Sequence, residues 1–298
     1  MSLPVFEKQI EFLSRSFDII SLRYLRDCLK NGYRIEPGSI LLTFDDGYKN
    51  NRLIVWPYLS SLDIPFSVFI STNHVGQGIR FPTYYLRAAL FSTEKSHVYV
   101  KGLDRDLDLS TREKRVLAKN TLEVLLKRSP QKMARQIIGE LMDLVPEERW
   151  SEINGRFQSD APMTWDDVRE LAAAGVAVGS HCHDHFILHS KQNPLEMSEQ
   201  VRLSKELIIK ELGSCDCIAY PDSGPNSLDS QAIISARETG YELGFTCVSG
   251  EIVNCVNPMI LPRLGISDDL DHFRFNLNTS FRFNRSYQNW SDRYPRLA

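Results

Sequence analysis

Two adjacent carboxylates, Asp45 and Asp46, follow an apolar run in the stretch LLTFDDGYKN. The run SILLTF is rich in apolar and β-prone residues, and it predicts a buried strand that ends before Gly47. Two like charges at such a point repel each other and resist burial. Either one aspartate caps a following helix in solvent, or a cation offsets the repulsion. Beside a divalent cation the two can divide the chemistry, because one carboxylate binds the ion while the other accepts a proton.

A cluster of histidines follows another apolar run. The stretch GSHCHDHF contains His181, His183 and His185, and His189 lies just beyond it. In a helical turn, the spacing of His181 and His185 places two imidazoles on one face, near enough to bind one ion. One carboxylate and two imidazoles leave open positions on a divalent ion, which is typical of catalytic rather than structural sites.

The elements around these clusters indicate how they can meet. Apolar strands are predicted at residues 39–44, 65–71, 176–181, 217–221, 243–248 and 260–266. Helices that alternate with them are predicted at residues 6–17, 22–29, 51–62, 164–175, 195–212 and 230–239, with Pro57 expected to kink or split the third. This alternation predicts a mainly parallel sheet or barrel, in which the carboxyl ends of the strands share one face. The two clusters can therefore converge although 135 positions (181 minus 46) separate them.

The middle of the chain does not follow this alternation. From about residue 80 to residue 160 the pattern is mostly helical, with helices predicted at 116–127 and 131–144. A capping box at Ser110–Glu113 is expected to start the first of them. We interpret this segment as a helical insertion. We expect it beside the groove at the strand carboxyl ends; the alternative is a position on the far side.

Composition excludes several classes of protein. The chain has 298 residues, with 42% hydrophobic residues, 24% charged residues and a net charge of -3, so it lacks the basic footprint of a nucleic-acid-binding protein. No apolar stretch is long enough to span a bilayer, and no secretory signal is recognisable. The six cysteines lack disulfide-scaffold spacing and are expected to be reduced. These features favour the cytoplasm, although the native chain could extend upstream.

The order and context of the motifs TFDDGY and HCHDH resemble the polysaccharide deacetylase family, carbohydrate esterase family four. Further similar segments are MTWDDVRELAAAGVAVGSHCHDH, LSKELIIKELG, AYPDSG, ETGYELGFT and LPRLGI, so the resemblance covers about residues 6–266 outside the insertion. It implies a distorted (β/α) barrel with a metal groove at the strand carboxyl ends. We expect a single domain over residues 1–298, with the helical insertion at about 80–160.

The resemblance also implies a role for each motif residue. Asp45 would be the general base, and Asp46, His181 and His185 would bind a divalent metal, usually zinc. The reaction would be the hydrolytic removal of an N-acetyl group from an amino sugar. The backbone N–H of Tyr48 would help to stabilise the oxyanion. The residues expected to contact substrate are Tyr48, Tyr220 and Pro221.

The sequence departs from the family pattern at three points. Cys182 stands where the second motif usually has Ser or Thr; its thiol could brace the loop weakly or compete as a ligand. The third motif lacks its arginine, and Arg263 is the expected substitute, because pairing with Asp45 would keep that base ionised. The alternative is a surface arginine at a strand end. The histidine acid of the last motif is not evident, since His272 lies in a stretch that predicts an exposed helix.

Some features do not fit into these motifs. His183 and His189 are expected to face solvent or line the groove rather than bind metal. The aromatic and basic tail FRFNRSYQNWSDRYPRLA predicts a packed C-terminal arm, or a surface on which a glycan stacks.

Three functions remain open. One is deacetylation of an N-acetylated sugar in a surface polysaccharide, a lipopolysaccharide or a lipid-linked glycan. A second is deformylation or another amide hydrolysis on the same scaffold. A third is glycan binding by a protein that has lost turnover.

Overall fold

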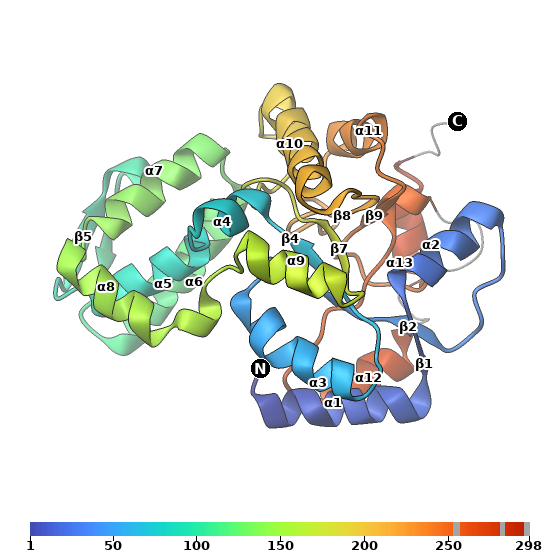
Figure 1. The fold of residues 1–298 in the computed structure, drawn as a ribbon. Coiled ribbons are helices and arrows are strands. Elements are labelled where there is room, and N and C mark those ends of the chain that lie inside the picture. The colour runs from blue at the N-terminus through green and yellow to red at the C-terminus, as the bar shows by residue number, and fades with distance from the viewer. Residues whose placement is uncertain (253–256, 281–283, 295–298) are drawn as a thin grey trace.

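A computed structural model describes residues 1–252, 257–280 and 284–294 (Figure 1). Its centre is a parallel sheet in the order β3-β4-β7-β8-β9. The strands are β3 (Thr43–Phe44), β4 (Ser67–Ile70), β7 (Ala177–Ser180), β8 (Cys217–Ala219) and β9 (Leu243–Phe245). The sheet curls into an open half-barrel, and the predicted alternation of strands and helices builds it.

Helices surround this sheet and bury two apolar clusters against it, a large one and a smaller one that contains Leu22 and Leu25. They are α1 (Leu3–Ser16), α2 (Leu22–Asn31), α3 (Trp56–Ser61), α4 (Thr72–Gln77), α9 (Trp165–Ala173), α10 (Pro194–Leu212), α11 (Ser230–Glu238), α12 (Leu270–Asn278) and α13 (Asn284–Ser291). Two predicted starts have their expected caps, since Ser21 accepts from Tyr24 N–H and Thr164 forms a reciprocal capping box with Asp167.

The segment around Pro57 is divided, as its proline predicts. Residues Asn51–Val55 form a π-helical turn, and α3 starts at Trp56, which places Pro57 in the first turn of the new helix. A proline is tolerated there because its missing N–H would have no intrahelical partner.

Two predicted strands differ from the structure. The run SILLTF is two strands, because β2 (Ser39–Leu41) pairs with β1 (Asp18–Ile20) in a separate parallel sheet and only β3 joins the central sheet. The run ILPRLGI is not a strand, and its pairing with the sheet is limited to a bridge between Phe245 and Leu261. Pro262 follows at once and has no N–H to extend a ladder.

The segment at about 80–160 forms a lobe with its own apolar core. Its elements are α5 (Pro82–Ser92), β5 (His97–Val100), β6 (Arg105–Asp108), α6 (Arg112–Arg128), α7 (Gln131–Met142) and α8 (Glu147–Arg156). The antiparallel β5–β6 hairpin was not expected in a helical segment. The predicted cap is displaced by one residue, because Thr111 and not Ser110 accepts from the first turn of α6.

The lobe contacts loops at the carboxyl ends of the central strands. Arg135 on α7 pairs with Asp184 in the loop after β7, and Lys127 on α6 pairs with Asp222 in the loop after β8, each at 2.7 Å. The lobe therefore lies at the face expected to hold the groove. Figure 1 shows it as the green group of helices beside the sheet.

The described part of the C-terminal tail packs against the barrel. Trp290 donates from its indole N–H to the Pro225 carbonyl, and the Tyr287 and Tyr294 hydroxyls donate to the carbonyls of Ile260 and Leu228. This is the packed-arm alternative; residues 281–283 and 295–298 of the tail lie outside the described residues. Within the described ranges, no helix is long and apolar enough to cross a membrane.

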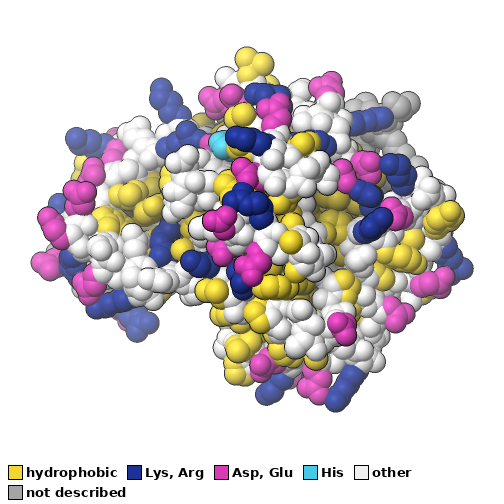
Figure 2. All heavy atoms as spheres, in the orientation of Figure 1, with side chains coloured by type: hydrophobic (Ala, Val, Ile, Leu, Met, Phe, Trp, Pro, Cys, Tyr) yellow, Lys and Arg dark blue, Asp and Glu magenta, His cyan; other side chains and the backbone are white. Residues whose placement is uncertain are grey.

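Basic and acidic side chains are interspersed on the face shown in Figure 2. No broad basic field stands out on that face. The described cysteines are all free thiols, and Cys255 lies outside the described residues.

Candidate active site

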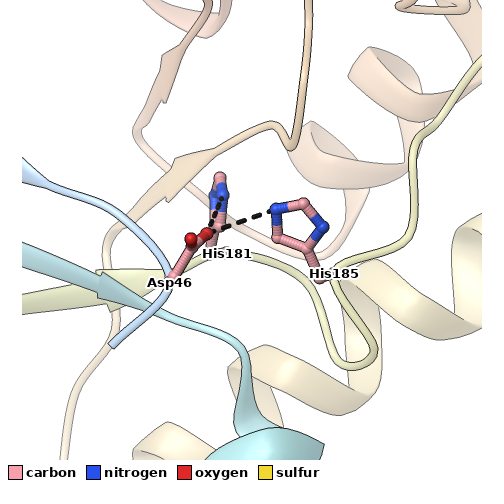
Figure 3. Close-up of side chains that lie close together, drawn as sticks. All are labelled: Asp46, His181 and His185. Carbon is pink, nitrogen blue, oxygen red and sulfur yellow. Dashed lines mark ion pairs between the residues drawn. The ribbon is translucent and has the colours of Figure 1, made fainter. Parts of the chain in front are cut away.

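Asp46, His181 and His185 converge at the carboxyl ends of the central strands (Figure 3). Asp46 Oδ1 lies 3.4 Å from His181 Nε2 and 3.2 Å from His185 Nε2. The ligand atoms of all three residues lie within 4.8 Å of one another. The three side chains come from the turn after β3 and the loop after β7, so the parallel sheet brings the two sequence clusters together.

The orientation of His181 suits metal binding. Its ring is almost fully buried, and its Nδ1–H donates to the Ala219 carbonyl at 2.7 Å. This bond fixes the tautomer in which Nε2 carries the free lone pair, and Nε2 faces Asp46. One carboxylate and two imidazoles so placed fit a divalent metal ion with open coordination positions.

The charges of this cluster compensate one another. Burial opposes ionisation of Asp46, but the neighbouring imidazoles of His185 and His181 lower its pKa well below the usual range. Burial likewise opposes a charge on His181, while Asp45 and Asp46 raise its pKa. The carboxylate of Asp46 is therefore held in the form that binds a cation.

Left-handed backbone conformations, rather than a helical turn, bring the ligands together. Asp46 has φ 73° and His185 has φ 52°, and Cys182 between the histidines has φ 61°. The helical spacing argument for His181 and His185 was therefore wrong about conformation although the rings do meet. Gly47 has φ 83°, and a Cβ there would lie 2.9 Å from the Ile70 side chain.

Residues that follow β4 hold the histidine loop in this shape. Ser71 Oγ donates to the His181 carbonyl at 2.9 Å, and Asn73 N–H donates to the His183 carbonyl at 2.8 Å. The His183 ring is bonded through Nδ1 to Thr72 Oγ1 at 2.8 Å, so it supports the loop instead of facing solvent freely. This brace was not visible in the sequence, because its members lie more than a hundred residues away.

Cys182 is completely buried in the core, and burial raises the pKa of its thiol. It is not part of the ligand cluster. The backbone N–H of Cys182 instead donates to Ser180 Oγ at 3.2 Å. A neighbouring hydroxyl on β7 therefore braces the loop, in place of the side chain at position 182.

Asp184 joins the histidine loop to three other elements. Its carboxylate accepts from Asn73 at 2.6 Å, from Gln200 at 2.9 Å and from Arg135 of the lobe at 2.7 Å. Its backbone N–H donates to Gln200 Oε1 at 2.7 Å. Because His185 is the next residue, this network fixes the backbone from which that ligand projects.

Asp45 lies beside the triad and is paired with Arg263. The Arg263 guanidinium donates to both carboxylate oxygens at 2.7 and 2.8 Å, and its Nε–H donates to the Thr246 carbonyl at 3.1 Å. The expected pairing is thus present, and Arg263 is not a free surface residue. Burial opposes ionisation of Asp45, but Arg263 and then His181 lower its pKa below the ordinary value. Asp45 is therefore a carboxylate at neutral pH.

Tyr48 contributes to an aromatic wall next to His185. Its ring lies 4.9 Å from that of Phe81, which contacts His185 at 5.5 Å and stacks on His74 at 4.1 Å between ring centroids. Burial and Asp46 raise the pKa of Tyr48, so its hydroxyl stays protonated. Within the described ranges the Tyr48 N–H makes no hydrogen bond.

Phe81 and His74 were missed by the sequence argument. His74 is buried and donates from Nδ1 to the Ile79 carbonyl at 2.7 Å, which orients its ring against Phe81. The one local signal is that both residues follow β4 in the chain, His74 within α4 and Phe81 after it, and this signal did not distinguish them from their neighbours.

Tyr220 and Pro221 lie at the same end of the sheet, but both are buried. The Tyr220 side chain is inside the main core with no exposed surface, and its hydroxyl has no hydrogen-bond partner among the described residues. Its ring therefore has no surface open to a substrate. The Ala219 carbonyl just before it is the part of this motif that reaches the site, through His181.

The remaining histidines offer no obvious acid. His189 is buried, neither in solvent nor in the triad, and donates from Nε2 to the Ser129 carbonyl of the lobe at 3.2 Å. His272 is exposed on α12, as its pattern predicted.

A large cavity of about 1580 Å³ reaches Thr43 and Arg263, but none of the three triad residues lines it.

Comparisons with known proteins agree on the fold. No protein-family model matches the sequence, and no curated protein matches it. Solved structures do match. IcaB from Ammonifex degensii superposes with a TM-score of 0.59 at 15% identity, covering 94% of this chain and 89% of that one.

Two further similar structures are those of deacetylases. The Streptococcus pyogenes deacetylase PplD, solved in complex with acetate, has a TM-score of 0.57 at 14% identity over 94% of this chain and 86% of its own. The deacetylase domain of BpsB from Bordetella bronchiseptica has a TM-score of 0.52 at 18% identity over 86% of this chain and 82% of its own. These likenesses confirm the distorted (β/α) barrel of the deacetylase type that the motifs implied.

Proposed function

We propose that this chain is a polysaccharide deacetylase-like hydrolase that uses a divalent metal, zinc by preference, to remove N-acetyl groups from an amino sugar of a glycan. The observation that carries the proposal is the convergence of Asp46, His181 and His185 beside the Asp45–Arg263 pair. A fold shared with solved deacetylases supports it. The glycan would be a surface polysaccharide, a lipopolysaccharide or a lipid-linked sugar.

In this proposal Asp46, His181 and His185 hold the metal, and Asp45 stays off it. A bound divalent ion would supply Lewis-acid chemistry, by polarising the amide carbonyl and acidifying water. Asp45 accepts a proton from the attacking water, because Arg263 keeps it ionised. The Tyr48 N–H donates to the oxyanion that develops on the carbonyl oxygen.

Hydrolysis then breaks the C–N bond and releases acetate and a free amine. The leaving nitrogen needs a proton, and the described histidines outside the triad are bonded elsewhere or lie on other surfaces. We assign this step to Asp45 as well. Asp45 gives the leaving nitrogen the proton that it took from water. A single carboxylate would then act first as base and then as acid.

The lack of a free histidine near the triad, among the described residues, favours one alternative. Without a separate histidine acid, the chain could bind a glycan at the metal site and turn it over poorly or not at all. Deformylation of an N-formyl sugar is a further variant, since it needs the same base and metal ligands.

One assay separates these possibilities. The protein is stripped with a chelator, reloaded with zinc and incubated with N-acetylated and N-formylated oligosaccharides and lipid-linked sugars, and released acetate and formate are measured. We expect acetate from the wild type and a loss of about 10²–10⁴-fold in Asp45→Asn. Formate alone would favour the deformylase, and glycan binding without release of either acid would favour the binding protein.

A further inference from the structure

A second pocket lies where the lobe meets the barrel, apart from the metal triad. Its volume is about 460 Å³. It is lined by the end of α6, by the loop after His185 and by the loop after β8. Its lining includes the polar side chains of Lys127, Arg128, His189, Ser190, Lys191 and Asn226. None of them belongs to the machinery proposed above.

Hydrogen bonds hold His189, which lines this pocket, and the loop around it. His189 donates from Nε2 to the Ser129 carbonyl and accepts from Lys191 N–H through Nδ1, each at 3.2 Å, so both ring nitrogens are occupied and the ring is neutral. Gln192 ties the same loop to the lobe, because its Oε1 accepts from Gln131 N–H at 3.0 Å. The pocket walls are therefore held in place before any ligand arrives.

The rim of the pocket carries an excess of positive charge. Lys127 is paired with Asp222 at 2.7 Å, which offsets one cation. Arg128 and Lys191 are exposed, and neither has a carboxylate partner in the part of the chain that the structure describes. The side chains of Ser190 and Asn226 line the same pocket and can donate hydrogen bonds.

This combination of groups is suited to an anion. A guanidinium can bind a phosphate or a carboxylate through two parallel hydrogen bonds, and an ammonium adds a point charge. The pocket volume admits such a group together with part of a sugar ring. The pocket also shares its loops with the metal site, since Lys191 follows His185 closely and Asn226 follows Ala219, whose carbonyl orients His181.

We propose that this pocket binds an anionic group, a phosphate or a carboxylate, on the glycan whose amide is cleaved at the triad. The substrate would then be an anionic glycan, and the lobe would contribute to its recognition through Arg128. The identity of the ligand as substrate rests on the proposed function; anion binding itself does not.

The first test measures binding without turnover. Chelator-treated protein, in which no metal can capture the anion, is titrated at low ionic strength with N-acetylglucosamine phosphate, glucuronate and neutral N-acetylglucosamine. The variant is Arg128→Gln/Lys191→Gln. The matched control is Arg112→Gln, an exposed cation at the other end of α6, ~24 Å away along the helix axis.

We expect the double variant to bind an anionic sugar at least tenfold more weakly, while Arg112→Gln binds as the wild type does. Whichever of N-acetylglucosamine phosphate and glucuronate binds the wild type more tightly identifies phosphate or carboxylate as the preferred group. Equal affinity of the wild type and the double variant for both anions would overturn the proposal. So would an equal loss in Arg112→Gln, because that result indicates net charge rather than a site.

The second test separates this proposal from the proposed function. Zinc-loaded wild type and double variant are compared for acetate release from a neutral and an anionic N-acetylated oligosaccharide. We expect the double variant to lose activity only on the anionic substrate, through a higher KM. If the wild type releases no acetate from any substrate but still binds the anionic sugar through Arg128 and Lys191, the proposed function fails and the pocket stands.

Discussion

Asp45 and Asp46 are neighbours in the chain but have different surroundings. Asp45 is bonded to the guanidinium of Arg263, whereas Asp46 faces the imidazoles of His181 and His185. A backbone with φ 73° at Asp46 turns the two carboxylates toward these separate partners. The proposed division between a base and a metal ligand is based on this geometry.

Arg263 gives the first prediction. Because the guanidinium lowers the pKa of the buried Asp45, Arg263→Gln should raise that pKa, and the acid limb of the pH–rate profile should move to higher pH. Activity at neutral pH should fall by about tenfold or more, as expected when a base is no longer fully ionised. Arg263→Lys keeps the charge but loses the bidentate contact with Asp45. Its acid limb and its activity should therefore lie between those of the wild type and those of Arg263→Gln. An unshifted acid limb in Arg263→Gln would contradict the role of Arg263.

The loop after β7 is the element on which the site most depends. Asp184 connects it to α4, to α10 and, through Arg135, to the lobe. Since His185 follows directly, the position of one ligand depends on contacts from three elements. A ligand held by such outer contacts loses metal affinity when they are removed.

Asp184→Asn should therefore weaken zinc binding by about 10–100-fold, the range seen when outer partners of a metal ligand are lost. Arg135→Gln should have a smaller effect in the same direction, because it removes one of the three donors to the Asp184 carboxylate. Competition with a chromogenic chelator measures both affinities. Lys132→Gln on the same helix is the control, since Lys132 is exposed and has no ion pair in the described ranges. Unchanged affinity in Asp184→Asn would refute this dependence.

His189 links the lobe to the barrel and gives a prediction for pH. Burial lowers its pKa, so the folded protein favours the neutral ring. The unfolded chain, in which His189 has a pKa of about 6.5, therefore takes up a proton at a higher pH than the folded protein does. The contribution of the neutral ring to the free energy of unfolding is fully present above about pH 6.5 and is lost as the pH falls toward the lower pKa of the folded state. Urea unfolding of the wild type should show a stability loss between about pH 7 and pH 5 that is smaller in His189→Gln. Parallel stability profiles for the two proteins would show that His189 does not titrate on unfolding.

Parts of these elements could be predicted from the sequence, and parts could not. The cap at Thr164, the break at Pro57 and the strand-helix alternation are local, and they are present, whereas the capping box predicted at Ser110–Glu113 is replaced by a cap at Thr111. The division of SILLTF between two sheets depends on distant partners, and the loss of the last strand follows from Pro262 at the bridge with Phe245. The proposed ligand residues could be named because each lies in a short local motif, TFDDGY for Asp46 and HCHDH for His181 and His185. The Asp184 network and the Phe81 wall could not, because tertiary contacts between distant segments form them.

At the scale of the molecule, the lobe has its own core and is attached to the barrel through loops that carry the site. We propose that a body attached at this face narrows the approach to the triad on one side. Shape would then select substrate, because a long stiff polymer would have to pass the lobe while a short chain end would not.

We therefore expect acetate release to be faster, in kcat/KM, from a short N-acetylated oligosaccharide than from a long polymer of the same sugar. A monosaccharide should be slower than the oligosaccharide, because it makes fewer binding contacts. The measurement is acetate release at matched concentrations of N-acetyl groups. A preference for the long polymer would reject selection by the lobe, whatever its position.

We propose above all that Asp46, His181 and His185 together bind a divalent metal. The most direct measurement is anomalous diffraction at the zinc edge from a crystal of the zinc-loaded protein. We predict one strong peak at about 2.0–2.2 Å from an Asp46 oxygen and from Nε2 of both histidines, with Asp45 still bonded to Arg263. Zinc bound elsewhere while these three side chains keep their present contacts, or Asp45 bound to the ion in place of Asp46, would contradict the account.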